Sequence, residues 1–388
     1  MAHLTNVPRR RADARILHLT HDNVFIARFS RLIDEVAPGR SSYIILASGG
    51  ALAHPVLGAV TITRTVAESR RAVLDAIADF DVLIVHYMFA SWARIVTEVA
   101  PRITVVWSGY GGDYYGSTHD PYADQLGPRT AALRAEIAPT VRPHARIMRW
   151  WQRRRSADAL ARAAAAADGF SAPVRADLEV FTARFPGFEG RYLQLSYSTA
   201  EVAAPARSRP SGENVLVGNS ASLTNNHLEV FDWLSRLRTE GRTVVVPLSY
   251  GEPPAYRDAV IGAGRRLFGS DFAPVLEHLP LHDYQEMLSG CAFVLMGHRR
   301  QQGLGNVLSA LLGGSAVVLD ADNPVHRQLT QAGARFGRLY DPAARSLDDL
   351  AVSEAQCARN HEVVRRLRGR DRVLEDLRAA LEVLGSPR

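Results

Sequence analysis

The sequence predicts an α/β fold of two parallel, doubly wound domains followed by a C-terminal helix. Three observations lead to this prediction. Apolar runs of strand length alternate with helix-length segments along most of the 388 residues, as in parallel sheets with crossover helices. The chain is too long for one ordinary hydrophobic core. The alternation stops in a Pro- and Ser-rich segment at 204–213 and then restarts, as expected of a linker.

These observations set the expected domain boundaries. We expect a basic arm at 1–14, an N-terminal Rossmann-like domain at 15–203, a linker at 204–213, a C-terminal Rossmann-like domain at 214–350, and a helical segment at 351–388.

The first domain is expected to begin with a strand at 15–20 and a helix at 24–36. Phe25, Phe29 and Ile33 lie on one stripe of that helix. Further strands are expected at 43–47, 81–87, 102–107 and 191–196, and further helices at 66–80, 92–100 and 174–184.

The second domain repeats this alternation. Its strands are expected at 214–217, 243–248, 275–279, 292–296 and 316–319, and its helices at 228–237, 256–268, 283–288 and 306–312. Asp283 is expected to cap the third of these helices. The tail at 352–384 is expected to be helical and rich in charge.

Composition narrows the class of protein. Hydrophobic residues make up 47% of the chain and charged residues 22%, which indicates a globular protein. The two cysteines form no zinc or disulfide pattern. The N-terminus lacks an apolar signal core and no apolar run approaches the ~20 residues of a membrane span, so we expect a cytoplasmic protein. The net charge of +6 favours an anionic partner.

Residues 291–324 carry the main functional signal. They predict a strand, a polar loop, a helix and a second strand, and Gly303 and Gly305 open the helix beside Arg299 and Arg300. Glycines at a helix start expose backbone N–H groups, and the helix dipole favours an anion there. We expect the diphosphate of a nucleotide-activated sugar. The alternative is a buried unit in which the glycines only turn corners.

Four polar residues fall at expected strand ends in the first domain: His18, Asp22, His86 and Asp113. In a parallel sheet these ends form the edge at which ligands bind. Each residue also has a structural interpretation, because an aspartate in a Gly-rich turn often caps a helix and a lone histidine often lies in the core.

Residues 142–162 contain seven arginines and the pair Trp150-Trp151. Indole rings favour the headgroup zone of a membrane and arginines attract anionic lipids, so this segment predicts an anionic membrane surface as partner. A solvated basic helix with inward tryptophans is the alternative. No nucleic-acid motif accompanies the segment, and we expect no nucleic-acid partner.

Other nucleotide folds are disfavoured. No Gly-x-Gly-x-x-Gly follows the first strand and no P-loop is present. Asp320-Ala-Asp322 matches the Asp-x-Asp pattern of metal sites, but it lies at a strand end in the second half. We therefore expect no metal site, and we expect no cofactor. Two Rossmann-like domains facing a cleft, with a C-terminal helix, form the architecture called GT-B.

Four segments carry a resemblance to a known family: Val217–Ser220, Asn225–His227, Val245–Tyr250 and Arg300–Gly305. They resemble the bacterial 4-acetamido-4,6-dideoxy-galactose (Fuc4NAc) transferases of enterobacterial common antigen assembly. Asn323-Pro324 also fits. The resemblance covers roughly residues 15–333 and is thinner in the first half, where the loops differ.

The resemblance implies an inverting, metal-independent glycosyltransferase on the inner face of the cell membrane. It would move the sugar from a dTDP donor to a polyprenyl-diphosphate-linked glycan. Another nucleotide sugar with a soluble glycan or protein acceptor, an epimerase, and a non-catalytic sugar-nucleotide binder remain alternatives.

The expected mechanism assigns a role to each candidate. Asp113 is the first choice of general base and Asp22 the second, while His86 would orient the acceptor or replace them. The donor site would consist of Gly218, Asn219, Ser220, Asn225, Tyr250, Arg300, Gln301, Gln302, Gly303, Leu304, Gly305 and Asn323. Arg300, Ser220 and the backbone at Gly303–Gly305 would stabilise the leaving diphosphate.

Overall fold

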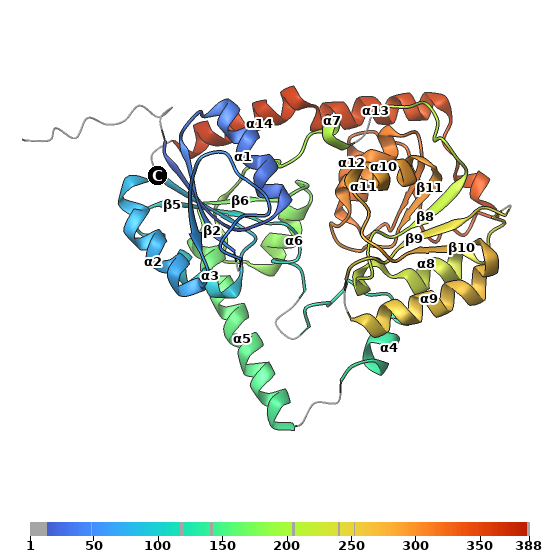
Figure 1. The fold of residues 1–388 in the computed structure, drawn as a ribbon, viewed down its shortest axis with the longest axis horizontal. Coiled ribbons are helices and arrows are strands. Elements are labelled where there is room, and N and C mark those ends of the chain that lie inside the picture. The colour runs from blue at the N-terminus through green and yellow to red at the C-terminus, as the bar shows by residue number, and fades with distance from the viewer. Residues whose placement is uncertain are drawn as a thin grey trace, which may run out of the picture. The chain divides into compact units, whose positions relative to one another are not determined.

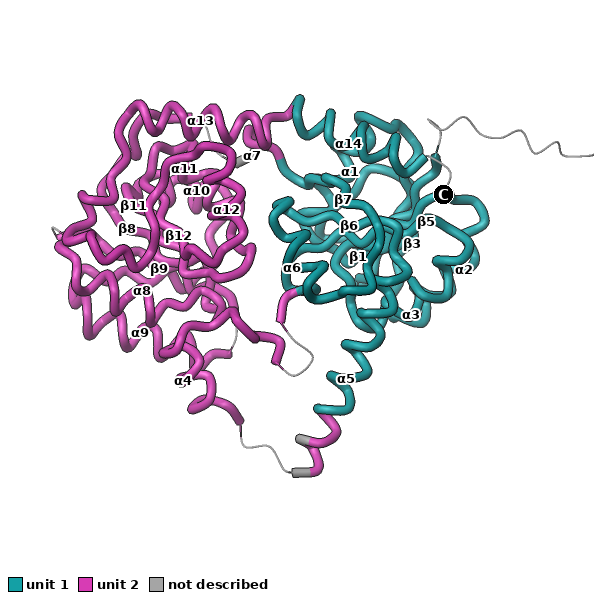
Figure 2. Tube along the Cα trace, turned by 180° about the vertical axis from the view of Figure 1, so that it is seen from behind, with its two compact units in different colours: residues 1–114, 150–198, 371–388 teal, residues 115–149, 199–370 magenta. Residues whose placement is uncertain are grey.

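The computed structural model describes residues 14–47, 49–116, 120–139, 143–203, 206–239, 241–251 and 253–385. The chain forms two compact units, each built on a parallel sheet (Figure 1, Figure 2). Unit 1 comprises 1–114, 150–198 and 371–388, and unit 2 comprises 115–149 and 199–370. The expected α/β fold is confirmed. Residues 1–13 of the expected basic arm lie outside the described residues.

Unit 1 contains a seven-stranded parallel sheet of order β3-β2-β1-β4-β5-β6-β7. Its strands are β1 (Ile16–His21), β2 (Ser41–Leu46), β3 (Ala59–Thr63), β4 (Val82–His86), β5 (Thr104–Ser108), β6 (Gly169–Ser171) and β7 (Arg191–Tyr192). Its helices are α1 (Val24–Val36), α2 (Val66–Ala76), the short η2 (Ile77–Asp79), α3 (Ala90–Val99), most of α5 (Pro143–Ala166), α6 (Asp177–Arg184) and nearly all of α14 (Arg370–Leu384).

Unit 2 contains a six-stranded sheet of order β10-β9-β8-β11-β12-β13. Its strands are β8 (Asn214–Val217), β9 (Val244–Pro247), β10 (Phe272–Val275), β11 (Cys291–Met296), β12 (Ala316–Leu319) and β13 (Gly337–Arg338). Its helices include α4 (Pro128–Glu136), α7 (Ala200–Ala203), η3 (Leu223–Asn225), α8 (His227–Leu234), α9 (Pro254–Phe268), η4 (Gly269–Asp271), α10 (Leu281–Ser289), α11 (Leu304–Leu312), α12 (Pro324–Gln331), η5 (Leu347–Leu350) and α13 (Glu354–Arg368). Helices α8 and α9 cover one face of this sheet, and α10 and α11 the other (Figure 1).

Local chemistry explains the first helix. The Asn23 side chain accepts hydrogen bonds from the backbone N–H groups of Phe25 and Ile26, at 2.9 and 3.0 Å, and so caps α1. The helix then buries Ile26, Phe29 and Ile33 in the core of unit 1. The neighbouring central strand β4 is buried at every residue, as expected of a strand covered on both faces.

Several elements differ from their expected positions. The strand expected at 275–279 is β10, which ends at Val275. Helix α10 begins at Leu281 after Pro280, so Asp283 lies in its first turn and is not its cap. The structure adds the edge strand β3, in which Thr61 and Thr63 interrupt the apolar residues, so the sequence shows no continuous apolar run there. The C-terminal tail forms two helices, α13 and α14, because the backbone leaves the helical conformation at Gly369.

The two units are built from interleaved segments. The chain passes between them after residues 114, 149, 198 and 370, whereas the composition of the sequence predicts a single linker at 204–213. Described residues of that segment are bound within unit 2: Arg207 N–H donates to Leu312 O at 2.7 Å and Ser211 N–H to Ser289 O at 2.8 Å. No local sequence pattern marks such interleaving, because it depends on contacts between distant residues.

Candidate functional site

The candidate donor site lies in unit 2, where the neighbouring parallel strands β8 and β11 end. Asn225 connects the loops that follow them. Its Oδ1 accepts hydrogen bonds from the Asn219 backbone N–H at 2.8 Å and from His298 Nε2 at 2.9 Å. Its Nδ2 donates to Ser220 Oγ at 3.0 Å and to Ser222 O at 3.2 Å. Every polar atom of this fully buried amide is used.

The backbone around Asn225 determines the protonation of His298. Asn219 N–H can only donate and Ser222 O can only accept, so the amide orientation is unambiguous. His298 Nε2 must then carry the proton, and Nδ1 is an acceptor. Burial, with the nearby charge of Arg300 adding to it, lowers the pKa of His298 to about 3. Nδ1 has no hydrogen-bond partner within the described part of the chain.

Gln302 holds Arg300 beside this network. The Oε1 atom of Gln302 accepts hydrogen bonds from Thr224 Oγ1 at 2.6 Å and from Arg300 Nε at 3.0 Å. Its Nε2 donates to Asn219 Oδ1 at 3.2 Å. A guanidinium is therefore positioned just before the start of α11.

The backbone at the start of α11 is open. Gly303 precedes the helix with φ of +65°, in the left-handed region that favours glycine. A Cβ on Gly305 would meet nothing within 4 Å. Leu304 begins the helix, whose first N–H groups have no partner inside the helix and favour an anion.

Gly218 has a different role. A Cβ there would lie 2.7 Å from both Asn225 Oδ1 and His227 Nε2. Glycine is therefore required for the close packing of this loop against α8.

The remaining expected donor residues are less uniform. Gln301 N–H donates to Tyr115 OH at 3.1 Å, and its buried side chain leaves Oε1 without a partner among the described residues. Asn323 caps α12 through Val325 N–H at 2.9 Å and donates to His298 O at 3.0 Å, so it supports the loop. Tyr250 is 56% exposed.

Asp320 is bound inside unit 2. Its Oδ2 lies 3.6 Å from Arg299 Nε, and its Oδ1 accepts from Asp322 N–H at 2.9 Å. Burial raises the pKa of Asp320, and the neighbouring Arg299 and Asp322 N–H oppose that shift.

Sequence reasoning missed two residues of this network, His298 and Asn226. Asn226 adopts φ of +51° and is buried. It donates to Gly297 O at 2.8 Å and to Gln125 O at 3.0 Å, and accepts from Gly127 N–H at 2.8 Å. The Asn-Asn dipeptide before a helix was a usable signal, because asparagine tolerates this backbone region. Nothing local identifies Gln125 and Gly127.

In unit 1 the expected histidines form a buried chain. His18 Nδ1 lies 3.0 Å from His86 Nε2, and His18 Nε2 lies 3.2 Å from Ser41 Oγ. His86 Nδ1 lies 3.4 Å from Tyr110 OH. Burial lowers the pKa of His18 well below its usual value and that of His86 to about 3, so both rings are neutral at pH 7.

Asp113 is saturated with hydrogen bonds. Oδ2 accepts from Trp107 Nε1 at 2.7 Å and Met88 N–H at 3.1 Å, and Oδ1 from Tyr110 N–H at 2.9 Å and Gly111 N–H at 3.1 Å. Burial raises the pKa of Asp113, while the bonds from Trp107, Tyr110 and Met88 oppose the rise. This geometry makes the carboxylate the anchor of the loop after β5.

Asp22 has more freedom. It accepts from Ala53 N–H at 2.6 Å, His54 N–H at 3.1 Å and His54 Nδ1 at 3.2 Å. Its side chain keeps 14% of its surface exposed, and His54 keeps 42%. A carboxylate with three recorded partners and some exposure can accept one more hydrogen bond.

The comparisons with known proteins agree with this fold. Three solved structures resemble the chain at the level of fold. Anabaena Alr3699/HepE in complex with UDP-glucose has a TM-score of 0.62 at 12% identity, covering 95% of this chain and 100% of that chain. An E. coli trehalose-6-phosphate protein bound with UDP-2-fluoro glucose has 0.63 at 12% identity, covering 96% and 99%. The N-terminal domain of Candida albicans trehalose-6-phosphate phosphatase has 0.63 at 11% identity, covering 95% and 96%.

The sequence comparison identifies the family. The model of the family described as 4-alpha-L-fucosyltransferase, glycosyl transferase group 56, matches residues 159–360. That match covers more than half of the chain. It includes the Asn225 network, Arg300 and the start of α11. The chain therefore belongs to the 4-alpha-L-fucosyltransferase family, glycosyl transferase group 56, and is a glycosyltransferase of GT-B fold.

Proposed function

We propose that the protein transfers a Fuc4NAc-like deoxy-amino sugar from a dTDP-linked donor to a polyprenyl-diphosphate-linked glycan, with inversion and without a metal. The observation that carries this proposal is the Asn225–Gln302–Arg300 network beside the open first turn of α11. Family membership supports the sugar class. Two proteins of similar fold were solved with uridine-linked sugars, which supports a nucleotide sugar as donor.

The donor diphosphate would bind at the first turn of α11. Fixed N–H groups and Arg300 would stabilise the negative charge that develops on the leaving nucleoside diphosphate. Asn219, Ser220 and Gln302 would hydrogen-bond the donor, with Tyr250 at the border of the site.

In the transfer step, the acceptor hydroxyl oxygen forms a bond to the anomeric carbon while the carbon–oxygen bond to the diphosphate breaks. The hydroxyl proton passes to a carboxylate, and the leaving diphosphate keeps the bonding electron pair. We place the proton on Asp22, because Asp113 already accepts four hydrogen bonds. His86 would act through Tyr110, its neighbour at 3.4 Å.

A thermal-shift titration with dTDP, UDP, GDP and ADP tests the donor. A ligand that binds only the folded state raises the melting temperature. We expect dTDP alone to raise the melting temperature, and Arg300→Ala to remove that increase. A selective shift with another nucleotide would replace the dTDP donor, and no shift at all would overturn the site. Conversion of the donor without any acceptor would instead indicate an epimerase.

We also propose that α5 attaches the protein to the inner face of the cell membrane. The segment between Glu136 and Asp158 contains six arginines and no Asp or Glu. Ile147 and Met148 are each 58% exposed, Trp150 40% and Trp151 49%. A helix with such exposure supports lipid contact better than inward packing. None of the described helices has the length and hydropathy that a membrane crossing needs.

Flotation with anionic liposomes tests this attachment. Replacing Trp150 and Trp151 with serine should reduce flotation strongly. The matched control replaces Leu267 and Leu276, which are each 47% exposed on unit 2, with serine, and should float like the unmodified protein. Equal flotation of both variants would count against a membrane role for α5.

A further inference from the structure

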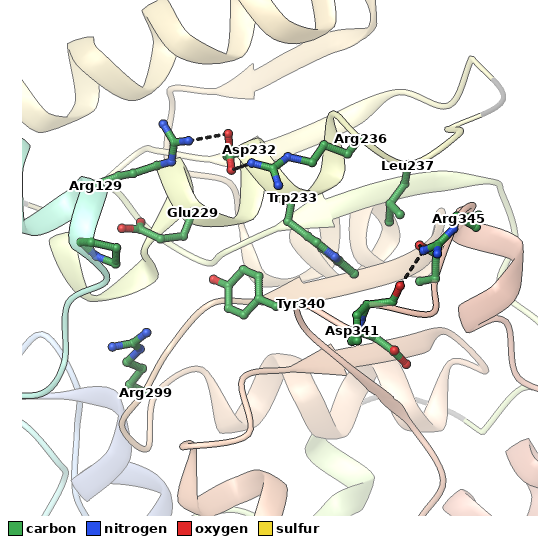
Figure 3. A pocket seen from close by; sticks show the side chains of 13 residues that line it. Arg129, Glu229, Asp232, Trp233, Arg236, Leu237, Arg299, Tyr340, Asp341 and Arg345 are labelled. Atoms are coloured by element: carbon green, nitrogen blue, oxygen red, sulfur yellow. Dashed lines mark hydrogen bonds and ion pairs between the residues drawn. The ribbon is translucent and has the colours of Figure 1, made fainter.

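Unit 2 contains a cavity of about 580 Å³ that the donor site does not use (Figure 3). Residues of α8 and of the turn after it, of the start of α4 and of the segment after β13 line it, together with Arg299. Helix α8 lies on one face of the sheet, while α11, whose first turn forms the candidate donor site, covers the other (Figure 1). The volume is within the range of about 300–1,000 Å³ that is usual for small-molecule sites.

Two aromatic side chains form a corner at the centre of the cavity. The rings of Trp233 and Tyr340 lie 6.0 Å apart at an angle of 75°. Both pack partly against the hydrophobic core of unit 2, which fixes their positions. Among the residues drawn in Figure 3, neither the indole N–H nor the phenol O–H has a hydrogen-bond partner. The corner therefore presents an apolar surface and two polar atoms that the residues drawn in Figure 3 leave without a hydrogen bond.

The backbone at Tyr340 is unusual. Its φ of +62° lies in the left-handed region, where a side chain other than glycine is strained. Such strain is retained where the surrounding structure requires it, often at functional sites. Burial also raises the pKa of Tyr340, so the phenol keeps its proton and can donate a hydrogen bond.

The charges around the cavity nearly balance. Its lining contains Arg129, Arg236, Arg299 and Arg345, and also Glu229, Asp232 and Asp341. Asp232 accepts from Arg129 at 2.6 Å and from Arg236 at 2.5 Å, on separate oxygens. This line of alternating donors and acceptors borders the cavity (Figure 3). A strongly anionic ligand would meet three carboxylates, and a cationic ligand would meet four guanidinium groups.

We propose that this cavity binds a neutral saccharide, as a site separate from the donor site. The C–H face of a sugar ring can pack on Trp233, as apolar surfaces do on aromatic rings. Hydroxyl groups both donate and accept hydrogen bonds, so they match the Tyr340 hydroxyl and the Arg129–Asp232–Arg236 line. A planar nucleobase could stack on the indole of Trp233, but it has fewer groups that could hydrogen-bond to the Arg129–Asp232–Arg236 line. The cavity would give this glycosyltransferase a second saccharide-binding site, in addition to the site for the sugar that it transfers.

Saturation-transfer proton NMR tests the proposal with N-acetylglucosamine, N,N′-diacetylchitobiose and, as the anionic counterpart, glucuronic acid. The protein is kept saturated with dTDP, and the measurement is repeated without it. Saturation should reach the C–H protons of the neutral sugars under both conditions. Trp233→Leu should weaken their binding about tenfold or more, because it removes the stacking surface. Leu276→Ala, at an exposed leucine of unit 2 that does not line the cavity, is the control and should bind normally.

A second variant guards against a folding defect in Trp233→Leu. Arg345 is exposed at the border of the cavity, and Arg345→Gln should weaken binding by a few fold without lowering the melting temperature. The proposal is overturned if no neutral sugar receives saturation, or if both cavity variants bind like the unmodified protein. It is also overturned if glucuronic acid binds more tightly with a steep salt dependence, which would indicate an anion site.

Discussion

Replacement of Asp113 by asparagine separates an anchoring role from a catalytic one. The carboxylate accepts two hydrogen bonds on each oxygen, from Trp107 and Met88 on one side and from Tyr110 and Gly111 on the other. An amide presents one oxygen and one NH₂ group. Whichever way it is turned, two of these donors face another donor. The side chain is only 7% exposed, so water cannot easily replace the lost partners.

The magnitude follows from these contacts. A hydrogen bond to a charged group contributes about 1.5–3 kcal/mol, so the loss of two costs about 3–6 kcal/mol. Removal of the buried charge offsets part of this cost, since burial already raises the pKa of Asp113. We expect a net loss of about 3 kcal/mol in unfolding free energy, which for a unit of this size lowers Tm by about 6–12 °C.

The assay combines melting with transfer kinetics. Melting is followed by near-UV circular dichroism, because Trp107 is buried and bound directly to Asp113. Asp22→Asn is the matched carboxylate-to-amide control. It should lower kcat about 10²–10⁴-fold, as for loss of a general base, with a Tm decrease of only a few degrees. If Asp113→Asn instead keeps its Tm and loses transfer activity, while Asp22→Asn stays active, our assignment of the two carboxylates is refuted.

Three further predictions test unit 2. Gly305→Ala should leave the free energy of unfolding unchanged or raise it by up to about 1 kcal/mol, but it should weaken dTDP binding about tenfold in a fluorescence or calorimetric titration. The control Gly262→Ala on α9 should bind dTDP normally. Normal binding by both variants would contradict a diphosphate site at the start of α11. Burial lowers the pKa of His227 and His298 to about 3 in the folded protein. In the unfolded chain a histidine has a pKa near 6.5, so below that pH the unfolded state binds protons that the folded state does not. The free energy of unfolding should therefore fall with acid, by about 1.4 kcal/mol per histidine at pH 5.5. Urea unfolding at pH 7.5 and 5.5 measures this, and a smaller loss in His227→Gln is required. Asn226→Gly should destabilise by about 2–4 kcal/mol through three lost hydrogen bonds, and Asn226→Ala by about 1 kcal/mol more because φ is positive; equal melting of the two variants would contradict the backbone argument.

Local patterns in the sequence determined most of the secondary structure and the fold class. Helix α1 and strand β12 have their expected bounds, because an apolar stripe and a short β-branched run depend only on neighbouring residues. The Gly- and Asn-rich segments at Gly218–Asn225 and Arg300–Gly305 were legible for the same reason. They follow adjacent parallel strands, so the topology of the sheet brings them together at one edge.

Only the tertiary structure decided how these segments are connected. The hydrogen bond from Asn226 to Gln125 joins residues separated by 101 positions, and that from Arg299 to Leu126 spans 173. The same holds for the proton position on His298, the interleaving of the units and the Trp233–Tyr340 corner. Each depends on which distant groups meet in a low-dielectric interior, where an unpaired polar atom is costly. Sequence periodicity reports which residues are buried but does not identify their partners.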